Sequence, residues 1–199
     1  MILALLGRLD GDEKALETAL DMIENEGIVT VLHSGGAAWG AGGSGCIRLL
    51  RQRGVRCVQD ERDKILSRLE RKRGRLQREL GDAFAEYERA RAGLRSADIE
   101  WLGALPHELR LTIDGVQVLL CSGIPGDQGN YFGAETSPSR RERARESAEA
   151  DIVASGGGTE FFAEVVGDCL LVNAPALDTG GWARVSTEGG VLRAEVVGR

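Results

Sequence analysis

A glycine-rich segment between two apolar runs, within residues 27–63, constrains the fold of this chain more than any other feature. Residues 28–32 are apolar or β-branched without alternation, which predicts a strand buried on both faces. Six glycines follow in the next 13 residues, so the backbone there can turn sharply and approach another segment closely. Ser44 is a candidate N-cap for a helix that Gly54 ends, and residues 55–58 predict the next strand. We expect a β–α–β unit with a site-forming loop after its first strand.

The flanking segments add a second strand–helix unit and a long helical region. Residues 2–6 predict a first strand, and Asp12 is a candidate N-cap for the helix after it. Residues 61–94 carry apolar side chains at helical spacing, interrupted by Gly74. An unbroken helix of that length would be roughly 50 Å long, so part of it should project from a compact domain.

From residue 108 the hydrophobic period changes to two. A hairpin is predicted around Asp114 and Gly115, because this residue pair favours the tight turn between antiparallel strands. A polar helix is predicted at 139–150, and strands at 151–155, 161–166, 169–173, 182–186 and 191–197. Helical units followed by antiparallel strands favour one α/β (α+β) domain over residues 1–199, with two sheets packed together, helices outside and a helical segment at 61–104.

The composition indicates a soluble protein with an uneven distribution of charge. Of 199 residues, 42% are hydrophobic and 28% are charged, and no apolar run is long enough to span a membrane. We expect a cytoplasmic location, because no secretory signal precedes the first strand. The four cysteines show no CxxC spacing and the chain has two histidines, so we expect reduced core thiols and no cofactor.

The positive charge is concentrated in residues 61–95, which hold 11 Lys/Arg against 7 Asp/Glu in a chain of net charge −6. Arg71, Lys72, Arg75 and Arg78 are the centre of this segment. They indicate a solvated helix face or a surface for an acidic protein, and the neighbouring apolar stripe could pair with a helix of a partner or of a second copy. Nucleic acid is an unlikely ligand, because no aromatic residues for base stacking accompany the basic run.

Several segments carry a resemblance to a known family. They are residues 45–58 (GCIRLLRQRGVRCV), 101–106, 109–120 (LRLTIDGVQVLL), 150–153 (ADIV) and 171–175 (LVNAP). In these segments and in its order of elements, the chain resembles the calcineurin-like metallophosphoesterases, specifically their small bacterial phosphodiesterase branch, over nearly its whole length. The resemblance implies a four-layer sandwich of two mixed β-sheets packed face to face and flanked by helices, with one long helical excursion.

The resemblance also implies a site for two divalent metals, which activate water and neutralise phosphate charge. The family's Asp-x-His motif falls on Arg8 and Asp10, so a carboxylate has become a cation and an imidazole a carboxylate. The bridging aspartate falls on Gly36, and the histidine after the hairpin falls on Ser122. No histidine accompanies Ser122 in a way that would make it a nucleophile.

The remaining ligand motifs are altered in the same way. The Gly-Asn-His-Asp motif reads Asp-Glu-Arg-Asp, with Glu61 and Arg62 at the ligand and acid positions and only Asp63 retained. The Gly-His-x-His motif has Gly157 and Thr159 in place of its histidines. The resemblance therefore predicts a scaffold without its metals and without a catalytic residue.

We expect a catalytically inactive pseudoenzyme that serves as a protein-binding scaffold or regulator, with a protein partner or as a homo-oligomer. Some known members of this fold serve in that way, as scaffolds within protein assemblies. An alternative is metal-independent binding of phosphate or nucleotide by Arg8 and Arg62, or weak phosphoesterase activity, with Asp10 and Glu61 in the same cleft. A rebuilt site for one hard cation, made of carboxylates that include Asp12, is a further alternative. Pairing of the arginines with these carboxylates is simpler than either.

Overall fold

Two five-stranded mixed sheets face each other in the computed structural model, which describes residues 1–127 and 129–198. The first sheet has the order β10-β9-β1-β2-β3 and the second β4-β5-β6-β8-β7. The strands of the first are β1 (Ile2–Leu6), β2 (Val31–His33), β3 (Arg56–Cys57), β9 (Trp182–Glu188) and β10 (Val191–Val197). Those of the second are β4 (Glu108–Ile113), β5 (Val116–Cys121), β6 (Ile152–Gly156), β7 (Phe162–Val166) and β8 (Cys169–Ala174).

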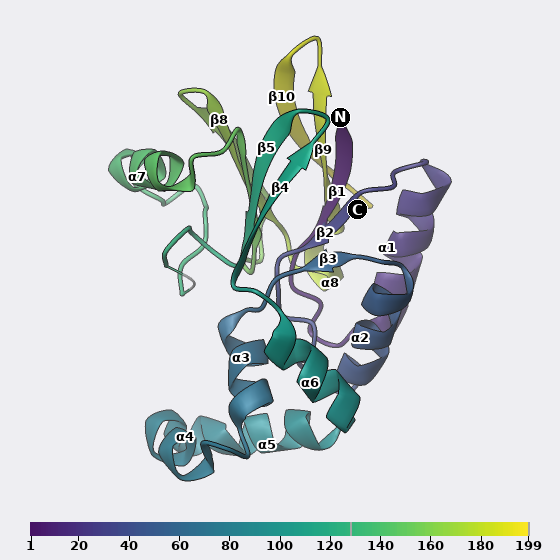
Figure 1. Cartoon of the computed structure of the whole chain (residues 1–199), viewed down its shortest axis with the longest axis vertical. Helices are drawn as coiled ribbons and strands as arrows, with labels where there is room; N and C mark the ends of the chain where they lie inside the picture. The colour runs from purple at the N-terminus through teal and green to yellow at the C-terminus, as the bar shows by residue number, and fades with distance from the viewer. Residues whose placement is uncertain (128, 199) are drawn as a thin grey trace.

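Helices cover the outer face of each sheet, and apolar side chains fill the space between the sheets. Helices α1 (Glu13–Asn25) and α2 (Gly43–Gln52) lie on the first sheet, and α7 (Pro138–Ala148) lies on the second (Figure 1). Leu5 and Val185 of the first sheet meet Leu120 and Val172 of the second, and all four are fully buried. This confirms the four-layer sandwich that the sequence predicts.

The β–α–β unit forms with shifted boundaries. The three strands β1, β2 and β3 are parallel, but β2 begins at Val31 because the chain after α1 first reaches β1 where Ala4 N–H donates to the carbonyl of Thr30. Val29, expected to be buried, is 93% exposed. Ser44 is not an N-cap: it lies inside α2, and its hydroxyl hydrogen-bonds a carboxylate oxygen of Asp98 at 2.6 Å.

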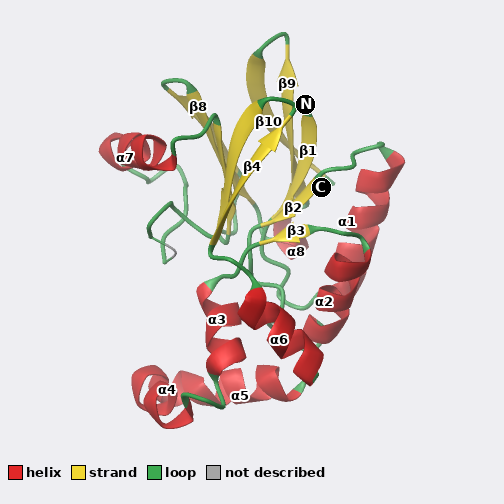
Figure 2. Cartoon of the chain, in the orientation of Figure 1, coloured by secondary structure: helices red, strands yellow, loops and turns green. Residues whose placement is uncertain are grey.

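The helical region predicted at 61–94 is present, but it is divided into several short helices. This region contains α3 (Glu61–Arg68), α4 (Arg73–Leu80), a 3₁₀ turn η1 (Gly81–Ala83) and α5 (Phe84–Ala92), followed by α6 (Ser96–Ala104). Together they form a folded excursion at one end of the sandwich (Figure 2). Gly74 lies inside α4, and the breaks fall at residues 69–72, between α3 and α4, and at Gly81, which has φ +55°.

The apolar stripe of this excursion faces inward. Ile65, Leu69, Leu76 and Phe84 form a small core of their own, against which Leu80 and Tyr87 pack. The stripe therefore is not free to pair with a partner helix, which corrects the sequence-based expectation. None of the described helices is long and apolar enough to cross a membrane.

Candidate functional site

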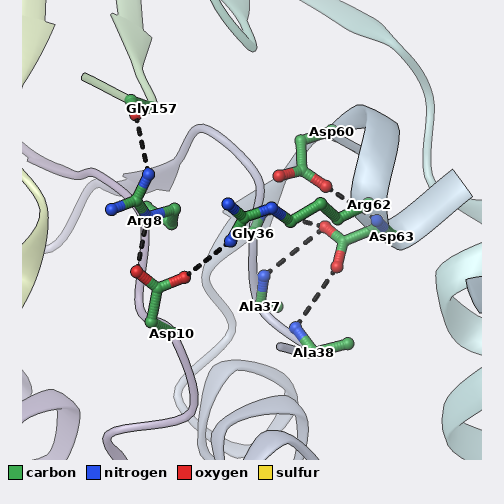
Figure 3. Close-up of polar contacts among 9 residues, drawn as sticks. All are labelled: Arg8, Asp10, Gly36, Ala37, Ala38, Asp60, Arg62, Asp63 and Gly157. Carbon is green, nitrogen blue, oxygen red and sulfur yellow. Dashed lines mark hydrogen bonds and ion pairs between the residues drawn. The ribbon is translucent and has the colours of Figure 1, made fainter. Parts of the chain in front are cut away.

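Four of the predicted site positions meet where strands of the two sheets end. Arg8 follows β1, Gly36 follows β2, Arg62 lies in the first turn of α3, and Gly157 follows β6. Figure 3 shows them grouped around Asp10. The carboxyl ends of parallel strands meet at one edge of a sheet, so the fold brings together residues that are far apart in sequence.

Asp10 bridges the two arginines. The Arg8 Nε donates to one carboxylate oxygen of Asp10 at 2.5 Å, and Arg62 Nη1 donates to the other at 3.2 Å. A second nitrogen of Arg8 donates to the Gly157 carbonyl at 3.2 Å, and the Arg62 guanidinium stacks on Trp39 at 4.8 Å from the ring centroid. The predicted pairing of these arginines with Asp10 is thus present, and both guanidinium groups are held in place.

Asp63 holds the backbone of the glycine-rich loop through hydrogen bonds. It is fully buried, and its carboxylate accepts N–H bonds from Gly36 at 2.9 Å, Ala37 at 3.4 Å and Ala38 at 3.2 Å. Burial raises the pKa of Asp63, while these N–H groups act in the opposite direction by stabilising the charged form. The one retained motif residue therefore shapes the loop.

Asp60 adds a second carboxyl to the same place. It caps α3 by accepting the Asp63 N–H at 2.7 Å. Its pKa is raised well above the ordinary value, first because the carboxyl is desolvated and then because Asp63 is nearby, while Arg62 opposes the shift. Asp10 offsets part of the charge of the two guanidinium groups, while the raised pKa values of Asp60 and Asp63 reduce the negative charge of this aspartate pair.

Tyr131 closes the site from the loop between β5 and α7. A Cβ on Gly157 would fall among the ring atoms of Tyr131, and a Cβ on Gly158 would lie 3.5 Å from the tyrosine Cβ. The pKa of Tyr131 is raised, first by burial and then by Asp60. No motif or spacing marks this residue, and sequence reasoning missed it.

Other predicted members lie outside the cluster or serve other contacts. Glu61 is exposed and pairs with Lys64 at 3.1 Å, and Asp12 caps α1 through the Ala15 N–H at 2.9 Å. Ser122 is buried at 2% exposure. Glu61 is therefore engaged outside the cluster of Arg8, Asp10 and Arg62. Asp12 is likewise used as a helix cap and is not part of a rebuilt carboxylate site.

The donors present do not fit the two metals that the resemblance implies. Within residues 1–127 and 129–198, no group of three or more His, Cys, Asp or Glu side chains could hold a metal ion. Gly36 and Gly157 offer no side-chain donor, and Arg8 brings positive charge. His33 lies in the first sheet, fully buried, and desolvation lowers its pKa to about 3, so it is neutral.

The basic residues of the excursion are mostly solvent-exposed. Arg71, Arg75 and Arg78 are exposed and Lys72 is partly exposed. Arg75 pairs with Glu79 at 2.6 Å, four residues along α4. Arg75 and Arg78 lie on α4, and Arg71 and Lys72 precede it. All four cysteines are buried and free, as expected.

Known proteins were compared with the chain by sequence and by structure. No protein-family model matches the sequence, and no curated protein gives a significant match. A hypothetical protein of Pyrococcus horikoshii has a TM-score of 0.78 at 16% identity, over 98% of this chain and 86% of that one. A metallophosphoesterase of Sphaerobacter thermophilus has a TM-score of 0.66 at 14% identity, over 100% and 88%.

Vacuolar Protein Sorting 29 of Cryptosporidium parvum is a third similar structure, with a TM-score of 0.60 at 12% identity, over 98% of this chain and 96% of that one. At identities this low, the structural matches show the fold alone. The chain has the metallophosphoesterase fold.

Proposed function

We propose that this protein is a non-catalytic member of the fold that acts by binding another protein, as a scaffold or regulator. The observation that carries the proposal is the Arg8–Asp10–Arg62 cluster. It places two guanidinium cations, both tied to one carboxylate, at positions that the resemblance assigns to metal and catalytic residues. The guanidinium groups of Arg8 and Arg62 would repel a divalent cation at these positions.

The chemistry of hydrolysis supports the same conclusion. Two-metal hydrolysis needs several anionic or imidazole donors that hold the cations and lower the pKa of bound water. The carboxylate of Asp63 is already used by three backbone N–H groups, and that of Asp60 caps a helix. The fold itself is compatible with a non-enzymatic role, because it occurs in a vacuolar protein sorting protein as well as in a metallophosphoesterase.

The excursion supplies a surface for the partner. Because its apolar stripe is buried in its own core, recognition there depends on Arg71, Lys72, Arg75 and Arg78. Long-range attraction by such a group raises the rate of association with an oppositely charged surface. The partner we propose is therefore an acidic protein.

The alternative function, metal-free binding of phosphate or nucleotide, receives less support. Arg8 and Arg62 are both paired with Asp10, and Arg8 also donates to the Gly157 carbonyl, so part of their donor capacity is already used within the protein. Weak phosphoesterase activity would need the same donors.

A metal analysis tests the inactive-enzyme part of the proposal. Protein purified from manganese- or zinc-supplemented medium should carry substoichiometric metal and should not hydrolyse a generic phosphodiester. The Arg8→Asp, Asp10→His double variant should also stay inactive, because bridged metals need several ligands acting together. Two tightly bound metals with hydrolysis by the wild type would refute the proposal.

Charge reversal tests the binding surface. Replacing Arg71, Lys72, Arg75 and Arg78 with glutamate should leave the fold intact and abolish recovery of the acidic partner in pulldowns from native cells. A matched control reverses the same number of exposed cations elsewhere, at Lys14, Arg51, Arg56 and Arg143, and should retain the partner. Equal recovery with both variants would exclude the excursion as the surface.

A further inference from the structure

Strand β10 (Val191–Val197) forms an open edge of the first sheet. Among the strands that the structure describes it pairs with β9 alone, in a continuous register from Val191 opposite Glu188 to Val197 opposite Trp182. The strand contains no proline and no bulge, which are two of the devices that prevent edge strands from pairing with other chains. It is seven residues long and lies at one side of the sandwich (Figure 1).

The side chains of β10 alternate between the core and the solvent. Leu192 and Ala194 pack against the core between the sheets, so Arg193 and Glu195 point to the opposite face. The Arg193 side chain is 68% exposed, and its Nη1 lies 3.8 Å from a carboxylate oxygen of Glu188. Glu195 is 63% exposed and pairs with Arg184 at 2.7 Å. Two opposite charges thus stand two residues apart on an open edge.

This spacing makes the edge complementary to itself. If two copies of β10 lie antiparallel with Ala194 on the two-fold axis, Arg193 of each stands directly opposite Glu195 of the other. Leu192 then faces Val196, and Val191 faces Val197. Centring the pair on Arg193 or on Glu195 instead would put like charges opposite each other, which destabilises cross-strand pairs. Of these three registers, the one centred on Ala194 is therefore favoured.

We propose that a second copy of this chain pairs through β10 in this antiparallel register, which joins the two first sheets into one continuous sheet. The strand supplies free backbone groups for the ladder, as in other cases of strand addition. Exposed apolar side chains beside this edge also favour pairing with a second copy of the chain. Val191 is 54% exposed, and Val165 on the neighbouring strand β7 is 56% exposed. A groove of about 390 Å³, lined in part by Val165, Leu192 and Ala194, opens between these two edges.

Charge-swap variants test the register. Sedimentation equilibrium over a wide range of protein concentration should show a dimer for the wild type. Arg193→Glu and Glu195→Arg should each weaken dimerisation about tenfold or more, since each change places like charges opposite each other twice across the axis. The double variant Arg193→Glu, Glu195→Arg should restore the dimer. Arg56→Glu, on the opposite edge strand β3, is the matched control and should behave as wild type.

Cross-linking tests the position of the axis. Ala194→Cys should form an intermolecular disulfide under mild oxidation, because residues facing each other on an axis bring their Cβ atoms close together. Val29→Cys, which is 93% exposed and away from β10, should not, and the four native cysteines are buried. A wild type that stays monomeric at every concentration would overturn the proposal, as would single charge reversals without effect or equal cross-linking at both sites. The binding surface on the excursion is tested by its own variants, so the two proposals fail separately.

Discussion

The ring of Tyr131 occupies the space that a side chain on Gly157 would need. Gly157 has φ +120°, a conformation that other residues rarely adopt, and its carbonyl accepts an Arg8 N–H at 3.2 Å. A histidine cannot be accommodated at position 157 unless the tyrosine moves and the backbone changes. The tyrosine ring, the glycine backbone and the arginine side chain thus pack together at this place.

Truncation of Tyr131 should uncover the backbone at Gly157. Tyr131→Ala should lower the free energy of unfolding by about 1–3 kcal/mol, because it removes a ring that is largely packed although 37% of the residue is exposed. Tyr131→Phe keeps the ring and should remain within about 0.5 kcal/mol of wild type. Urea unfolding of the three proteins gives the comparison. Equal loss in both variants would mean that the hydroxyl, and not the ring, is what matters.

Loss of the Asp63 carboxylate should be among the most damaging single changes in the chain. Asp63→Ala leaves the N–H groups of Gly36, Ala37 and Ala38 without their acceptor in a buried place, and should cost at least about 3 kcal/mol. Asp63→Asn keeps one acceptor oxygen and should cost less. Guanidinium unfolding measures the stability that each variant loses. Amide exchange of the loop measures how far its backbone is loosened. An alanine variant as stable as wild type would show that the loop keeps its shape without this support.

The raised pKa of Asp60 predicts a dependence of stability on pH. Because the folded protein holds this proton more tightly than the unfolded chain, the stabilisation is complete below the ordinary carboxyl pKa and is lost as the pH rises through the folded value. Asp60→Asn preserves the helix cap and cannot ionise. Its free energy of unfolding should therefore decline less than that of wild type between about pH 4 and pH 8, measured in denaturant at each pH. Parallel curves for the two proteins would contradict the assignment.

Neutralising Asp10 should release the positive charge of the cluster. Asp10 has φ +47°, which asparagine also tolerates, so Asp10→Asn changes the charge with little change in the backbone. We expect a loss of about 1 kcal/mol in low salt, because the ion pairs are only partly buried. Phosphate should raise the melting temperature of the variant and leave that of wild type unchanged. Stabilisation of the wild type by phosphate would instead favour the anion-binding alternative.

The sequence predicts the sandwich well where local chemistry and tertiary structure agree. Strand β1 is found at the predicted residues, and the Asp114–Gly115 turn has φ values of +50° and +83°, as a tight two-residue hairpin turn requires. Asp12 caps α1 as expected. In the turn and the helix cap, residues that are neighbours in the chain determine the conformation, so the sequence alone predicts them.

The errors arise where distant contacts decide. Helix formers continue through residues 69–72, so periodicity alone gives no reason for a break there. The break follows from Leu69, Leu76 and Phe84 turning toward a common core. Tyr131 comes from a loop without periodicity, and only the three-dimensional fold places its ring over Gly157.

The contacts of Asp63 bear on which substitutions the glycine-rich loop can tolerate. Asp63 holds the backbone of the glycine-rich loop, and none of its contacts requires a metal. Residues around it can therefore be exchanged one by one while the loop keeps its path.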